Sequence, residues 1–118
     1  MKKTMDVLHK LAALDGVRAV LIISADGFPL ESVINDKTLD ADELAALVRD
    51  GAAAARDMVE EVDSAQFVQG VFEHSKGSIL LTNLPLRMTL AILAGKGGNK
   101  PALWNAAATH FPEVIRAL

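Results

Sequence analysis

Residues 16–30, GVRAVLIISADGFPL, carry the local signals that decide the fold. Their first part, 17–23, is apolar at every position except Arg18 and β-branched at four of seven, which predicts a strand buried on both faces near the centre of a sheet. Asp26-Gly27 follows, and this pair readily supplies the positive φ angles of a hairpin turn. Residues 28–34 are then the return strand, and Pro29 suits an edge strand or a strand start. The stretch therefore predicts an antiparallel hairpin.

The longest predicted element is an amphipathic helix over residues 41–63. Asp40 is a good N-cap, and Glu43 stands three residues later, as in a capping box. At 100° per residue, an apolar stripe lies within about 60° of Leu44, and we expect it to face the sheet. The stripe consists of Leu44, Leu47, Val48, Gly51, Ala55, Met58, Val59 and Val62. Outside it lie Ala45, Ala46, Ala52, Ala53 and Ala54. Such a face of small residues would let a second helix come near.

The whole chain is predicted to form one domain over residues 1–118. A short amphipathic helix is expected at 4–14, three further strands at 65–74, 78–83 and 88–94, and a last helix at 101–117. Pro112 lies inside that last helix and is expected to kink or restart it near His110-Phe111. The order of elements is helix, strand, strand, helix, strand, strand, strand, helix.

Composition and charge exclude several classes of protein. The 118 residues are 51% hydrophobic, which excludes disorder as the dominant state. There is no cysteine, so disulfide scaffolds, thiolate zinc sites and cysteine catalysis are excluded. The net charge of −3 indicates no general attraction to nucleic acid or to anionic membranes. No apolar run is long enough for a signal peptide or a membrane span, so we expect a cytoplasmic protein whose apolar surplus lies in a core or an oligomer interface.

No catalytic residue, metal ligand or cofactor site is predicted. The loop Gly95-Lys96-Gly97-Gly98-Asn99-Lys100 precedes a helix, but it lacks the spacing and the Ser/Thr of a phosphate-binding loop. His9, His74 and His110 are dispersed and show no helical zinc spacing. One hypothesis for the function is a sensor that binds a small ligand, although few polar residues converge on a pocket.

Charge is concentrated in the long helix. Between Asp40 and Asp63 there are eight acidic and two basic residues, a net charge of −6, while the rest of the chain carries +3. The simplest interpretation is a solubilising face. The functional interpretation is a docking surface for a basic patch on a protein partner. The candidate docking residues are Asp42, Asp50, Asp57 and Glu61.

The ordered set of patterns resembles the Roadblock/LC7 domain family. Gly16-Val17 leads into Val20-Leu21-Ile22-Ile23 and then into the hairpin Ser24-Ala25-Asp26-Gly27-Phe28-Pro29-Leu30. The alanine-rich helix, the three-strand meander and the Gly/Asn-containing entry to the last helix continue the match over nearly the whole chain.

The resemblance implies an α+β fold. It consists of a five-stranded antiparallel sheet with the long second helix on one face and the first and last helices on the other. It also implies a dimer, usually of identical chains, in which the second helices pack together and the third strands pair. We expect a two-fold dimer that buries on the order of 1,200–2,000 Å². The candidate interface residues are Ala45, Arg49, Ala52, Ala53, Arg56, Glu60, Phe67, Gln69 and Val71.

The function implied by the resemblance is non-enzymatic. Members commonly regulate small Ras-like GTPases, and some accelerate GTP hydrolysis by reshaping the partner. Others are scaffolds or light chains of larger motor or signalling assemblies, which is the alternative function for this chain. No cofactor is implied.

Overall fold

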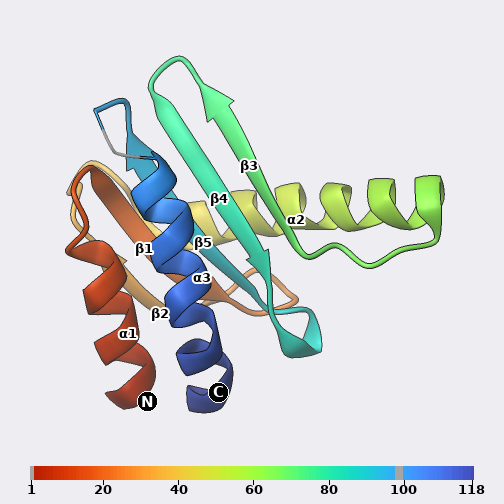
Figure 1. Ribbon diagram of the computed structural model, residues 1–118, viewed down its shortest axis with the longest axis horizontal. Coiled ribbons are helices and arrows are strands. Elements are labelled where there is room, and N and C mark those ends of the chain that lie inside the picture. Colours follow the sequence, from red (N-terminus) through yellow and green to blue (C-terminus); the bar gives the residue numbers. More distant parts are fainter. Residues whose placement is uncertain (1, 98–99) are drawn as a thin grey trace.

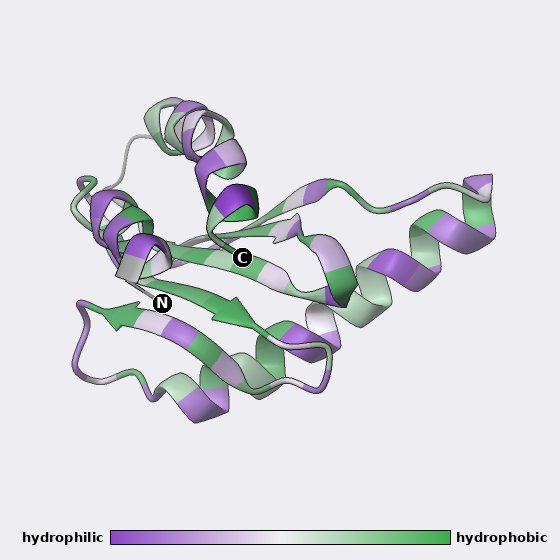
Figure 2. Ribbon diagram, turned by 90° about the horizontal axis from the view of Figure 1, so that it is seen from below, coloured by the Kyte–Doolittle hydropathy of each residue, from purple (hydrophilic) through white to green (hydrophobic). Residues whose placement is uncertain are grey.

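The computed structural model describes residues 2–97 and 100–118, and its strands form one antiparallel sheet in the order β2-β1-β5-β4-β3 (Figure 1). The strands are β1 (Val17–Ile23), β2 (Pro29–Ile34), β3 (Gln69–His74), β4 (Gly77–Asn83) and β5 (Thr89–Gly95). The helices are α1 (Lys2–Ala12), α2 (Ala41–Asp63) and α3 (Lys100–Ala117), with a short 3₁₀ segment η1 (Pro85–Arg87). Figure 2 shows α2 on one face of the sheet and α1 and α3 on the other. The predicted α+β architecture is confirmed.

The predicted hairpin forms one side of the sheet, with β1 as an inner strand and β2 at the edge. β1 pairs with β2 on one side and with β5 on the other. All its residues except Arg18 are buried. Gly27 in the connecting turn has φ +87°, a conformation that L side chains rarely adopt. Pro29 begins β2, which is an edge strand, so its missing N–H removes no bond from the centre of the sheet.

Alternation along β1 builds a core on each face of the sheet. Val20 and Ile22 pack into the core beneath α1 and α3. Leu21 and Ile23 pack into the core beneath α2. β1 therefore contributes apolar side chains to both cores, one on each face of the sheet.

Both ends of α2 are capped, and the cap at its N-terminus is the one that the sequence predicts. The Asp40 carboxylate accepts a hydrogen bond of 3.2 Å from the Glu43 N–H. At the other end Ser64 has φ 52°, and its N–H donates to the Glu60 carbonyl at 2.8 Å. The 23 residues between these caps form a helix about 34 Å long, at 1.5 Å per residue. Five strands about 4.8 Å apart span about 19 Å. The C-terminal end of α2 therefore projects past the sheet (Figure 1).

Several elements differ from the predictions. α1 covers Lys2–Ala12 rather than residues 4–14. β3 begins at Gln69 rather than at residue 65, because residues 65–68 run back from the projecting end of α2 before they reach the sheet. The connection between β4 and β5 contains η1. Pro112 does not restart the last helix, since α3 passes through it. Its ring removes one donor from the Ala108 carbonyl, and both residues are exposed, so water can hydrate that carbonyl. Gly98 and Asn99 of the predicted loop lie outside the described residues.

Candidate functional site

An uncovered apolar face runs along α2. Leu47, Met58 and Val62 are 67%, 62% and 73% exposed, although the stripe analysis predicted that they face the sheet. That prediction is wrong. The residues packed on the sheet are Ala45, Val48, Ala52 and Ala55. They centre about 60° around the helix from Leu44. Alanines let the helix approach the sheet closely, and the larger side chains remain outside.

An apolar groove adjoins this face. It has a volume of about 220 Å³ and lies between the first half of α2 and strands β3 and β4. Its lining consists of Leu44, Leu47, Val48, Gly51, Phe72, Ile79, Leu81 and Leu93. Phe72 on β3 and Val68 just before it are exposed. A groove of this kind, beside an edge strand, is the type of surface that another polypeptide covers.

Three residues predicted at a dimer interface belong to the protomer's own core. Ala45 and Ala52 have no exposed surface, and Phe67 is buried with them beneath α2. Their burial is therefore explained by packing within the protomer: Ala45 and Ala52 present no side-chain surface to a partner, and Phe67 is 8% exposed. Val71 packs on the opposite face of the sheet, towards α3.

The other predicted interface residues are separated by the fold. Ala53 and Glu60 are exposed on α2. Arg49 is also exposed. Its guanidinium donates to the Asp26 carbonyl at 3.2 Å, and this bond ties α2 to the turn between β1 and β2. Gln69 is half-buried on β3, and its Nε2 has no hydrogen-bond partner among the described residues.

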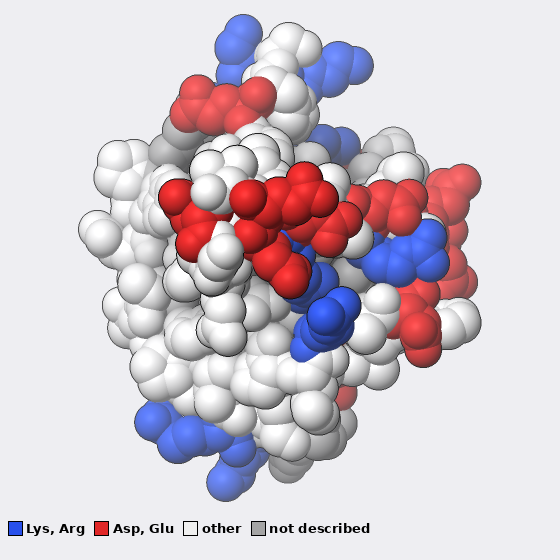
Figure 3. Space-filling view, turned by 90° about the vertical axis from the view of Figure 1, so that its right-hand side faces the viewer, with Lys and Arg blue, Asp and Glu red and all other residues white. Residues whose placement is uncertain are grey.

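Acidic side chains cover the outer side of α2. The candidates Asp42, Asp50, Asp57 and Glu61 are all exposed. Asp50 pairs with Arg49 at 2.9 Å, a surface contact that adds little stability. Figure 3, which looks onto the projecting end of α2, shows acidic side chains gathered there with basic ones beside them. The four candidate docking residues are therefore all accessible, and the projecting end of α2 is of mixed charge.

A second clamp, which the sequence did not reveal, ties α2 to the connection between β4 and β5. The Arg56 guanidinium donates to Asn83 Oδ1 at 2.7 Å and to Thr89 Oγ1 at 3.1 Å. It also donates to the carbonyls of Arg87 and Met88. Burial lowers the pKa of Arg56, and the nearby Arg87 charge lowers it further. No sequence motif marks these contacts, because they join residues about thirty positions apart.

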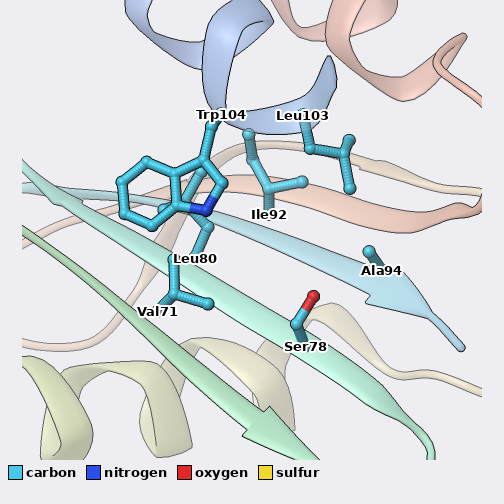
Figure 4. A pocket seen from close by; sticks show the side chains of 7 residues that line it. All are labelled: Val71, Ser78, Leu80, Ile92, Ala94, Leu103 and Trp104. Carbon is cyan, nitrogen blue, oxygen red and sulfur yellow. The ribbon is translucent and has the colours of Figure 1, made fainter. Parts of the chain in front are cut away.

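The face opposite α2 has a cavity beside Trp104. Trp104 on α3 lies over Val71 and Leu80, with the Ser78 hydroxyl at the other end (Figure 4). The enclosed space is about 10 Å³, close to the minimum that holds one water molecule. This cavity is too small for a nucleotide or a metabolite.

The described part of the chain contains neither a metal site nor a membrane-spanning helix. Among residues 2–97 and 100–118, no group of His, Asp and Glu side chains is placed to hold a metal ion. Within the same ranges, no helix combines the length and the hydropathy needed to cross a membrane.

The sequence matches the Roadblock/LC7 domain family over residues 3–94, and the chain belongs to this family. The predicted resemblance is confirmed. No curated protein sequence matches the chain.

Solved structures share the same fold. Myxococcus xanthus MglB is 17% identical, with a TM-score of 0.90 over 99% of this chain and 95% of that one. The gliding protein MglB of Thermus thermophilus is 19% identical, with a TM-score of 0.85 over 98% and 87%. MglC of Myxococcus xanthus is 14% identical, with a TM-score of 0.73 over 98% and 99%. At these identities the likeness establishes the fold.

Proposed function

We propose that this chain is a non-catalytic, homodimeric regulator or adaptor of a small Ras-like GTPase. Family membership over residues 3–94 carries the proposal and supports a role of the GTPase-regulator type. The fold shared with MglB and MglC is consistent with that role. The exposed apolar face of α2 supports a protein partner, because large apolar side chains clustered on one side of a helix mark an interaction surface.

The proposed dimer uses the projecting half of α2. Ala52 and Ala55 in this half still pack on the protomer's own sheet, but Met58 and Val62 on its outer side are exposed, and they would cover the apolar groove of a second protomer. A two-fold axis makes the contact reciprocal, so that the two α2 helices run antiparallel and the β3 edges pair. Arg49, Ala53 and Glu60 are exposed too, but at 100° per residue they lie on the other side of α2 from Met58 and Val62, so they fall outside this contact.

The proposed GTPase contact uses the acidic outer side of α2. In the two-fold dimer, both acidic helices lie on one face and present their carboxylates together. A complementary basic patch on the GTPase would be steered towards this face, with a rate that falls as salt is added. Asp42, Asp50, Asp57 and Glu61 are the proposed contact residues.

The test measures binding and turnover for the small Ras-like GTPases of the same genome. Each is loaded with GDP or with a non-hydrolysable GTP analogue and titrated with the full chain, and phosphate release is then followed with GTP. A regulator binds one nucleotide state more tightly, and the double variant Asp57→Asn/Glu61→Gln weakens that binding. Equal affinity for both states favours the scaffold alternative, and no binding to any of the GTPases contradicts the proposal.

A further inference from the structure

A polar cleft lies where the end of α2 meets the connection between β4 and β5. Its volume is about 500 Å³. One wall is the last turns of α2 and residues 64–67, and the other is residues 83–87. It is separate from the apolar groove, which lies at the first half of α2.

Arg56 brings an uncompensated positive charge into this cleft. Its hydrogen bonds go to neutral acceptors through Nε and Nη2, and it makes no ion pair with the described residues. Nη1 donates to no described residue, and it is not among the buried atoms without a partner. This nitrogen therefore reaches solvent in the cleft with its donors free, on a guanidinium that four other contacts hold in place.

Arg87 places a second guanidinium beside the first. It follows Leu86, and both residues have left-handed φ angles, 61° at Leu86 and 58° at Arg87, a conformation that non-glycine residues rarely adopt. Arg87 makes no side-chain hydrogen bond with the described residues, and its charge acts on Arg56. Leu86 is 86% exposed at the mouth of the cleft. The turn thus places Arg87, whose side chain makes no hydrogen bond with the described residues, and the exposed Leu86 next to the hydrogen-bonded Arg56.

Two acidic residues on α2 complete the lining without neutralising the arginines. Asp57 and Glu60 are exposed, and neither pairs with Arg56 or Arg87. An incoming anion would relieve the repulsion between the two guanidinium groups. The same carboxylates oppose that anion from the rim and limit its affinity.

We propose that this cleft binds an acidic peptide segment of a protein partner, with one carboxylate bridging Arg56 Nη1 and the Arg87 guanidinium and an adjacent apolar side chain resting on Leu86. Arginine favours carboxylates because its planar donors match both oxygens. The apolar contact selects a peptide over a free inorganic anion. The inference goes beyond the proposed function, because it concerns the chemistry of this cleft whether or not the partner is a GTPase.

The test titrates the full ¹⁵N-labelled chain with two matched probes, acetyl-leucyl-glutamyl amide and acetyl-leucyl-glutaminyl amide. Shifts of the Arg56 Nε–H and Arg87 backbone N–H signals report binding. We expect the glutamyl probe to bind with a dissociation constant of about 1–10 mM and the glutaminyl probe at least about tenfold more weakly. Inorganic phosphate is titrated as a third probe and should bind more weakly than the glutamyl probe.

Variants separate the cleft from general charge. Arg87→Gln should weaken glutamyl-probe binding by about fivefold, and Arg87→Lys by less, because lysine keeps the charge and loses the planar fork. Asp57→Asn should tighten binding by about twofold, because it removes a repelling carboxylate. Lys76→Gln removes an exposed charge from the β3–β4 turn and should leave binding unchanged.

The proposal would be overturned by equal binding of the two peptide probes, by shifts that leave the Arg56 and Arg87 signals unmoved, or by a loss of binding in Lys76→Gln as large as that in Arg87→Gln. Phosphate that binds more tightly than the glutamyl probe would also overturn it, in favour of a phosphate site. The Arg87 side chain is exposed, and only its backbone carbonyl, which the substitution keeps, accepts from Arg56, so Arg87→Gln should keep the thermal midpoint of the parent chain.

Discussion

At the scale of single residues, the fold depends on a few positions where backbone geometry leaves no choice. Gly77 begins β4 with φ +152°, and a Cβ there would lie 2.0 Å from the Ala94 carbonyl oxygen. The sequence places this glycine at the end of a hairpin loop but does not show that β5 presses against it. The pairing of β4 with β5 therefore requires glycine for a reason that only the assembled sheet reveals.

Gly77→Ala should lower the free energy of unfolding by about 2–4 kcal/mol, because both the φ angle and the Ala94 carbonyl oppose a side chain. The matched control is Gly97→Ala, since a Cβ at Gly97 would meet nothing within 4 Å. Urea unfolding followed by circular dichroism measures both. Equal losses in the two variants would contradict this account.

Asp36 fixes the loop between β2 and α2 through its ionised form. Its carboxylate accepts hydrogen bonds from the Thr38 hydroxyl at 2.6 Å and the Thr38 N–H at 3.0 Å. Its other oxygen accepts from the Arg18 guanidinium at 2.8 Å. These bonds, that of the Thr38 hydroxyl foremost, lower the pKa of Asp36 from 3.8 to about 2.

A folded-state pKa below the unfolded value makes the stabilisation by Asp36 complete above pH 3.8 and progressively lost as the pH falls towards 2. The urea midpoint of the parent chain should therefore exceed that of Asp36→Asn at pH 5, and the gap should shrink by pH 2. Asp26→Asn is the control, because the Asp26 side chain makes no hydrogen bond with the described residues. A gap that does not change with pH would refute the assignment.

At the scale of elements, the orientation of α2 shows where pattern analysis stops. The apolar arc of this helix is wider than the part that the sheet covers. A stripe centred on large side chains places Leu44 in the middle, whereas the sheet takes the alanine side about 60° away. Small residues let α2 pack closely on the sheet, whereas large ones hold it away. Which side of the helix faces the sheet therefore depends on the opposing surface as well as on the helix.

Ala52→Leu should lower the free energy of unfolding by about 1–3 kcal/mol, because Ala52 has no exposed surface and added methyl groups must push α2 from the sheet. Ala46→Leu is the matched control on the exposed outer side of the same helix. Unfolding at one fixed protein concentration measures both. If α2 instead faced the sheet through Leu47, the two variants would behave alike.

At the scale of the whole molecule, α2 is longer than the sheet is wide, and this mismatch leaves its apolar end uncovered. The proposed dimer resolves the mismatch, because the uncovered half of each helix lies over the groove of the other protomer. Part of the high apolar content of the sequence thus lies on the surface, at the uncovered end of α2.

Met58→Glu should raise the dimer dissociation constant by about tenfold or more, because it places a charge at the centre of the proposed contact. Ala46→Glu adds the same charge on the outer side of α2 and should leave the dimer intact. Size-exclusion chromatography with light scattering at micromolar concentration distinguishes the two. A parent chain that is monomeric at these concentrations contradicts the dimer itself.

The sequence predicted the order of the elements, the buried strand β1, the Asp26-Gly27 turn and the N-cap of α2, because each depends on residues near one another in the chain. The family could be predicted for the same reason, since its patterns are local and ordered. The tertiary structure alone decided that Ala45 and Ala52 are core and that Leu47 and Met58 are surface. It alone joined Arg56 to Asn83 and Thr89, and set Arg87 beside it. Those relations depend on how distant segments pack, and packing selects among faces that the helical period leaves equally apolar.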